Sequence, residues 1–189
     1  KSTFLAAALD SIAAQTCKDF ILYIGDDCSP NNLGEIVDGY RDKINLVYKR
    51  FDTNLGGKDL VAQWERCIDM TQGEDWLWLF SDDDVMEKNC VEEFYKTIKE
   101  KPKAGLIHFN VNRLDNATGK ISPLPKFPDF CSSKFYLDEK LKGHLISFVV
   151  EFVVRRDVFF DNGRFQNFDL AWGKCKIGRA VQQECRDRS

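Results

Sequence analysis

The chain has 189 residues, a formal net charge of −3 and 43% hydrophobic residues, values typical of one globular domain with a sizeable core. The slightly acidic balance argues against nucleic acid as the main partner, because a basic surface is needed to bind phosphates. The sequence has no apolar run of about 18 residues and no visible signal peptide, so neither a transmembrane helix nor a secretory leader is expected.

Cysteine and histidine usage limits the possible metal and redox chemistry. The seven cysteines are irregularly spaced and form no CxxC motif, which favours neither a disulfide framework nor a zinc site. We therefore expect reduced thiols in a cytoplasm. The two histidines, His108 and His144, are too few for a His-based metal site, and His108 is expected to be a packed strand residue.

The first hundred residues alternate between helical and extended patterns. In chain order we expect a helix over 3–15, a strand over 20–24, a helix over 33–40, a strand over 44–50, a helix over 58–70, a strand over 76–80 and a helix over 87–100. This alternation predicts a doubly wound α/β fold. Because such a domain usually opens with a strand, we expect a first strand to be missing from this chain.

The second half is less regular. We expect a strand over 104–114, a turn over 115–119, a proline-bearing loop over 121–136 that acts as a substrate lid, a helix over 137–145, a strand over 147–157 and a connection over 159–168. Glu151 is placed in the middle of its strand and is expected to pair with an arginine. We assign residues 1–172 to one domain and leave the polar tail 173–189 open as a frayed helix, a disordered tail or a non-native extension.

The strand over 76–80 leads almost directly into three adjacent carboxylates, Asp82, Asp83 and Asp84. A fully apolar strand is typical of a parallel sheet buried on both faces, and ligands bind beyond the carboxyl ends of such strands. Adjacent carboxylates repel one another, and a hard cation such as Mg²⁺ or Mn²⁺ would offset that repulsion. The pattern predicts a metal–diphosphate site. The alternative is an acidic loop in which Asp84 caps the next helix.

A second strand, over 20–24, also ends in acidic residues, Asp26 and Asp27. We expect both acidic groups to meet at one edge of the sheet. The chain has no GxGxxG motif after a strand and no phosphate-binding GxxxxGK[ST] loop. A bound diphosphate would therefore be neutralised by a metal, which indicates a nucleotide-sugar or a similar donor.

The stretch LDSIAAQTCKDFILYIGDDCSP resembles the opening of family 2 glycosyltransferases with the GT-A fold. The family's Ser-Ile-x-x-Gln-Thr and Asp-Asp-x-Ser patterns are matched by Ser11, Ile12, Gln15, Thr16, Asp26, Asp27 and Ser29. Residues 54–57 resemble its Asn-x-Gly turn, and residues 80–84 resemble its Asp-x-Asp region. The resemblance covers about residues 1–100 and implies a Rossmann-like, mostly parallel sheet flanked by helices.

The resemblance implies an activity: transfer of a sugar from a nucleotide-diphosphate donor, commonly a UDP-sugar, to an acceptor hydroxyl. Asp27 would contact the nucleobase, Asp82 would lie near the ribose, and Asp83 with Asp84 would hold Mn²⁺ or Mg²⁺ at the diphosphate. A cation there stabilises charge on the departing diphosphate. The remaining donor-binding candidates are Asp26, Ser29, Gly57 and Lys58.

Two departures from the family pattern bear on these roles. Ser81 stands where the family often has its first aspartate, so the assignment of the ribose and metal roles to particular aspartates is open. The family often carries an Arg-Asn pair in the helix after the glycine turn, where this chain has residues 62–64, Ala-Gln-Trp. Lys58 would supply the positive charge instead, or is a solvated lysine at the start of the helix.

Inverting members of the family use a carboxylate in the second half to deprotonate the acceptor. RRDVFFDNGRF resembles the segment that precedes this base, and after it only Asp169 stands before the polar tail. Asp169 is our candidate base. The alternatives are that Asp169 caps a helix and that the chain ends before the true base.

Two other functions stay open: a nucleotidyltransferase, and a domain that binds a nucleotide-sugar without turnover. The family's common setting is assembly of bacterial surface polysaccharides. We therefore expect a glycan or lipid-linked acceptor, no nucleic-acid partner, and a cytoplasmic protein with peripheral association at the inner face of the membrane.

Overall fold

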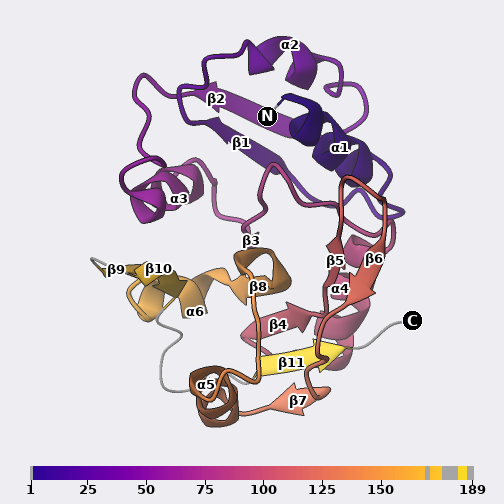
Figure 1. Cartoon of the computed structure of the whole chain (residues 1–189), viewed down its shortest axis with the longest axis vertical. Coiled ribbons are helices and arrows are strands. Elements are labelled where there is room, and N and C mark those ends of the chain that lie inside the picture. Colours follow the sequence, from indigo (N-terminus) through magenta and orange to yellow (C-terminus); the bar gives the residue numbers. More distant parts are fainter. Residues whose placement is uncertain (1, 169–170, 176–182, 187–189) are drawn as a thin grey trace. The chain divides into compact units, whose positions relative to one another are not determined.

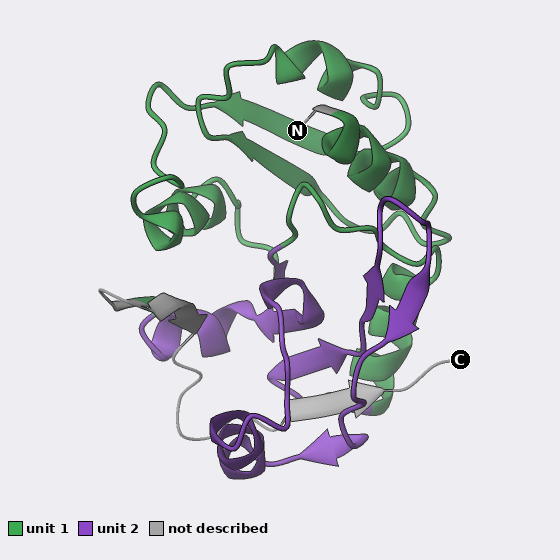
Figure 2. Ribbon diagram, viewed as in Figure 1, with its two compact units in different colours: residues 1–74, 80–100, 164–176 green, residues 75–79, 101–163, 177–189 purple. Residues whose placement is uncertain are grey.

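The computed structural model describes residues 2–168, 171–175 and 183–186. The backbone forms two compact units, each made of several stretches of the chain (Figure 2). The first unit contains 1–74, 80–100 and 164–176, and the second contains 75–79, 101–163 and 177–189. Among the described residues, no helix is long and apolar enough to cross a membrane.

The first unit carries most of the predicted helices (Figure 1). Its elements are α1 (Ser2–Ala13), β1 (Leu22–Asp26), α2 (Leu33–Asp38), β2 (Leu46–Arg50), α3 (Leu60–Ile68), α4 (Cys90–Glu100), β9 (Phe165–Phe168) and β10 (Ala171–Cys175). Strands β1 and β2 are parallel, with Leu22 opposite Leu46 and Asp26 opposite Arg50. The predicted alternation over this part of the chain is confirmed.

Helices α1 and α2 bury their apolar stripes against these strands. The apolar residues of α1 recur three and four positions apart, so they share one face of the helix. The buried core is formed by Leu5, Leu9, Ile12, Val37, Tyr40 and Ile44, with Leu22, Ile24, Leu46 and Phe80 packed around it. Burial of large side chains at this density supplies the main driving force for the unit.

The end of α1 is tied to the segment that precedes α4. Gln15 is 2% exposed; its Nε2 donates to the Glu87 carbonyl at 2.8 Å and its Oε1 accepts from the Val91 amide at 3.1 Å. The Met86 amide donates to Ser11 Oγ at 3.0 Å. Buried amide side chains need such partners. The Ser-x-x-x-Gln pattern therefore anchors the loop that carries the three aspartates.

The second unit is built on a mixed five-stranded sheet. Its elements are β3 (Trp76–Trp78), β4 (Leu106–Phe109), β5 (Asn112–Leu114), β6 (Ile121–Pro123), β7 (Phe130–Cys131), α5 (Ser133–Leu141), η1 (Val149–Glu151), β8 (Phe152–Arg155), α6 (Arg156–Asp161) and β11 (Gln183–Arg186). The strand order is β3-β8-β4-β11-β7. Only the β4–β11 pair is parallel within the described part of this sheet.

This topology corrects the expected role of the strand over 76–80. In the described residues β3 lies at one end of the five-stranded sheet and pairs antiparallel with β8, from Trp76–Arg155 to Trp78–Val153. Leu77 is buried, whereas Trp76 and Trp78 are only partly buried. In a sequence, a run of large aromatic residues has the same pattern as a strand that is buried on both faces. Here the Trp78 ring stacks on Phe109 with centroids 4.9 Å apart.

Four further expectations in the second half were wrong in their bounds: the strand over 104–114, the loop over 121–136, the helix over 137–145 and the strand over 147–157. The strand over 104–114 is two strands, because β5 turns away to pair with β6 across the turn at 115–119. The loop over 121–136 contains β6, β7 and the start of α5, which ends at Leu141. The strand over 147–157 is a short 3₁₀ turn, a strand and a helix. In the polar tail, the described residues lie in β10 and β11.

The expectation that Glu151 pairs with an arginine was also wrong. Glu151 lies in η1 and its Oε2 is 2.6 Å from Nε2 of His108, with both residues 1% exposed. Its Oε1 accepts from the Phe148 amide at 2.8 Å. The antiparallel pairing of His108 with Phe152 brings the two side chains together. His108 is a packed strand residue, as predicted.

We predict that Glu151→Ala lowers the free energy of unfolding by about 3–5 kcal/mol, because removing one partner of a buried polar pair leaves the other without compensation. Urea denaturation measures this change. Glu139→Ala is the control, since Glu139 is partly exposed near the end of α5 and pairs with the exposed Lys142 and His144 that follow the helix. Equal, small effects of the two substitutions would contradict a stabilising role for the buried pair.

Candidate functional site

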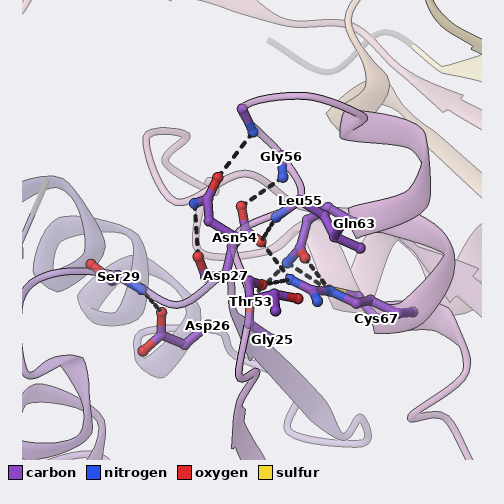
Figure 3. A network of polar contacts seen from close by, with 12 residues as sticks. Gly25, Asp26, Asp27, Ser29, Thr53, Asn54, Leu55, Gly56, Gln63 and Cys67 are labelled. Atoms are coloured by element: carbon purple, nitrogen blue, oxygen red, sulfur yellow. Dashed lines mark hydrogen bonds and ion pairs between the residues drawn. The ribbon is translucent and has the colours of Figure 1, made fainter.

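Asp26 ends β1 and its carboxylate is directed inward. Oδ1 accepts from the Ser29 amide at 2.8 Å (Figure 3). Oδ2 accepts from the Tyr48 hydroxyl at 2.8 Å, with Arg50 Nε 3.6 Å away. The Asp26 side chain has 0% exposure. A buried carboxylate requires such donors. Asp26 therefore joins the ends of β1 and β2 and has no exposed surface for a ligand.

The contact with Asp26 also changes the pKa of Tyr48. Burial and the hydrogen bond to Asp26 raise the pKa of the Tyr48 hydroxyl to about 12, because both favour its neutral form. The neutral hydroxyl is the form that donates to the carboxylate.

Asp27, the next residue, faces the opposite way, toward the turn over 54–57. Its Oδ1 accepts from the Leu55 amide at 2.7 Å and its Oδ2 from the Gly56 amide at 2.8 Å. The side chain of Asn54 donates to the Asp27 carbonyl at 2.8 Å. A Cβ on Gly56 would lie 2.7 Å from Oδ2, so the turn needs glycine for its close approach to the carboxylate.

Arg66, on α3, completes the surroundings of Asp27. Its Nη2 forms an ion pair with Asp27 Oδ1 and donates to the Thr53 carbonyl at 2.9 Å. Its Nε donates to Gln63 Oε1 at 2.5 Å, and its guanidinium lies 3.9 Å from the centre of the Phe51 ring. The carboxylate is thus held by three donors and keeps 23% exposure.

Arg66 was not predicted from the sequence, because the family pattern places the basic residue at 62–64, one turn earlier on the helix. A usable signal was present: Gln63 and Arg66 stand three residues apart, on one face of the helix that follows the glycine turn. Gln63 Nε2 donates to the Gly25 carbonyl at 3.1 Å, which fixes that face toward β1.

The three adjacent aspartates lie in the first unit, in a turn that precedes α4. Asp82 and Asp83 are exposed and Asp84 is partly buried, with its amide directed to the Ser81 carbonyl at 3.4 Å. Because α4 begins at Cys90, Asp84 does not cap that helix. Phe80, just before them, packs against the core formed by α1 and α2.

The other candidates are distributed as follows. Ser29 Oγ is buried and has no hydrogen-bond partner among the described residues. Gly57 and Lys58 are exposed at the end of the turn that faces Asp27. Asp169 lies outside the described residues. Within the described part of the chain, no group of three or more His, Cys, Asp or Glu side chains is placed to hold a metal ion.

Comparison with known sequences shows which protein family the chain matches. The sequence model described as "Glycosyl transferase family 2" matches residues 1–161. Glycosyltransferase GlyG of Streptococcus pneumoniae serotype 4 is 27% identical over 137 residues, which are 72% of this chain and 44% of that protein. Poly(ribitol-phosphate) beta-N-acetylglucosaminyltransferase TarS of Staphylococcus aureus strain Mu50 is 31% identical over 100 residues, 51% of this chain and 17% of TarS.

Solved structures of TarS from S. aureus share the fold. TarS 1–349 in complex with UDP-GlcNAc superposes with a TM-score of 0.69 and 18% identity, covering 99% of this chain and 56% of that one. The same TarS fragment with UDP gives a TM-score of 0.67 and 22% identity, over 87% of this chain and 46% of that one. The chain thus has the α/β GT-A fold, and it spans less than half the length of the curated relatives that it matches.

The Tyr48–Asp26 contact predicts a pH dependence. The pKa of Tyr48 is raised from 10.0 to about 12, so its contribution to stability is complete below pH 10 and is lost as the pH rises toward 12. We expect wild type to be more stable than Tyr48→Phe at neutral pH, and this difference to shrink over that window. Urea unfolding of both proteins from about pH 8 to 12 measures it. A difference that stays constant would contradict the contact.

Proposed function

Since the chain belongs to glycosyl transferase family 2, we propose that it transfers a sugar from a UDP-sugar donor to an acceptor hydroxyl. The observation that carries the proposal is the carboxylate of Asp27. Two backbone amides and Arg66 hold it at the carboxyl end of β1, where α/β folds bind their ligands.

The chemistry of Asp27 supports uracil as the nucleobase of the donor. An ionised carboxylate only accepts hydrogen bonds. Uracil presents an N–H donor at its N3 position, whereas cytosine presents an acceptor there. The relative TarS has been crystallised with UDP and with UDP-GlcNAc, which supports the same donor class for this chain. Asp26 would contribute by holding the strand end, and Asp82 would lie near the ribose.

We assign Asp83 and Asp84 to a divalent cation, Mn²⁺ or Mg²⁺. Mg²⁺ is usually bound by one or two carboxylates together with substrate phosphates, so the exposed Asp83 and the partly buried Asp84 fit this ion without a cage of protein ligands. When bound, the cation would offset the negative charge on the leaving diphosphate. The exposed Lys58, beside the Asp27 turn, would add positive charge near the phosphates.

The acceptor side of the proposal rests on the family and the relatives. We propose inversion at the sugar, with Asp169 as the base that deprotonates the acceptor hydroxyl. We further propose a glycan or lipid-linked acceptor and a place in polysaccharide assembly at the inner, cytoplasmic face of the membrane. The activity named for TarS, glycosylation of poly(ribitol phosphate), supports an anionic polymer as one such acceptor.

Calorimetric titration of UDP tests the donor site. We expect UDP to bind more tightly with Mn²⁺ present, and Asp83→Ala to remove only this metal-dependent gain. Asp27→Asn should weaken binding about 10-fold or more with or without Mn²⁺, because hydrogen bonds to charged groups contribute about 1.5–3 kcal/mol. Asp27→Asn preserves the size of the side chain but leaves one acceptor oxygen for the Leu55 and Gly56 amides, so circular dichroism and urea unfolding of the variant must show that the fold is retained.

Asp42→Asn is the matched control, since Asp42 is an exposed aspartate of the same unit, beyond α2. UDP affinity unchanged in Asp27→Asn would exclude Asp27 from base recognition. Failure of wild type to bind UDP would overturn the donor assignment. Binding of UDP-sugars without release of UDP in the presence of acceptor would instead indicate a non-catalytic binding domain.

A further inference from the structure

Arg164 fastens the strand β9 to helix α3 within the first unit. Its Nε lies 2.5 Å from Glu65 Oε2, and its Nη2 lies 2.6 Å from Asp69 Oδ1 and 3.3 Å from the Glu65 carbonyl. The Phe165 amide donates to Glu65 Oε1 at 3.0 Å, so both oxygens of Glu65 are engaged by consecutive residues. The rings of Phe165 and Trp64 lie 5.4 Å apart.

The backbone at Arg164 has a conformation that residues with a Cβ rarely adopt. Its φ is +61°, in the left-handed region, and the preceding Gly163 has φ +82°. A residue with a Cβ in this region costs on the order of 1–2 kcal/mol. Glycine would adopt the same turn more cheaply, so the side chain of Arg164 must offset that cost through the partners that it reaches. The chain enters the first unit at this residue.

Helix α3 thereby carries two sets of contacts. Gln63 and Arg66, three residues apart, hold Gly25 and Asp27 at the end of β1. Glu65 and Asp69, the C-cap residue of α3, are four residues apart and hold Arg164. Residues at these spacings share a helix face, so the two pairs lie on different sides of one short rigid element. Helix α3 therefore positions both the carboxylate of Asp27, which we propose to contact the nucleobase, and strand β9.

We propose that Arg164 is a positioning residue that sets the register of β9 on α3, and so fixes this strand relative to Asp27. The inference deepens the proposed function and rests on it. The chain continues from β9 directly into Asp169, the candidate base of the sequence analysis. With Asp169 as the base of the proposed function, a shift of β9 would move the acceptor side of the reaction, while Gln63 and Arg66 would keep their contacts with Gly25 and Asp27. An Arg164→Lys change would keep the charge but lose the fork that spans two carboxylates.

Steady-state kinetics and UDP titration of Arg164→Ala test the proposal. We expect kcat to fall by about 10-fold or more, because a small misplacement of reacting groups is costly, while the Kd for UDP changes less than about 2-fold. A merely structural role would loosen α3 and weaken UDP binding together with kcat. Arg164→Lys should fail to restore kcat. Arg41→Ala, which removes the exposed Arg41–Asp38 pair of the same unit, is the control and should leave both quantities unchanged.

A double-mutant cycle with Glu65→Gln isolates the contact itself. If Arg164 acts through Glu65, the double variant should lose no more kcat than Arg164→Ala alone, because coupled residues are not additive. Losses that multiply would overturn the proposal, as would an unchanged kcat in Arg164→Ala or parallel losses of kcat and UDP affinity.

Amide hydrogen exchange gives a readout that needs no ligand. Arg164→Ala should speed exchange at Phe165 and along β9 while β1 keeps its protection. If wild type binds no UDP, the proposed function fails, and the exchange experiment still decides whether Arg164 sets the register of β9. Unchanged exchange along β9 would overturn the inference even in an active enzyme.

Discussion

Two adjacent carboxylates at the end of one strand impose the main constraint on this structure. Asp26 and Asp27 point to opposite sides of β1, and neither can be removed from water without hydrogen-bond donors. Asp26 finds them in Tyr48 and in the turn at Ser29. Asp27 finds them in the backbone of the glycine turn and in Arg66. The pairing of β1 with β2, the tight turn and the placement of α3 together supply these donors.

The two carboxylates of this pair therefore have different roles. The inward carboxylate is fully used by the fold, whereas the outward one is held firmly and keeps part of its surface exposed. Such preorganisation lets a ligand bind without reorganising the site. Helix α3 holds both Asp27 and Arg164, through residues on two different faces.

The sequence predicted the first half of the chain well and the second half poorly, for a physical reason. In 1–100, helices and strands alternate with clear apolar periodicity, and each element is recognisable from local residues. Beyond 100, strands such as β8 owe their place to antiparallel partners distant in the chain. The pairing of His108 with Glu151 likewise depends on register, which no local pattern around either residue records.

By itself, the sequence determined the α/β class, the family resemblance, and the acidic ends at 26–27 and 82–84, because these depend on composition and on short-range spacing. The tertiary structure alone decided which carboxylate faces inward, which arginine replaces the expected basic residue, and which glutamate receives Arg164. Those choices depend on contacts between residues from 22 to almost 100 positions apart along the chain. Such contacts form only when several segments pack at once, so local propensity does not encode them.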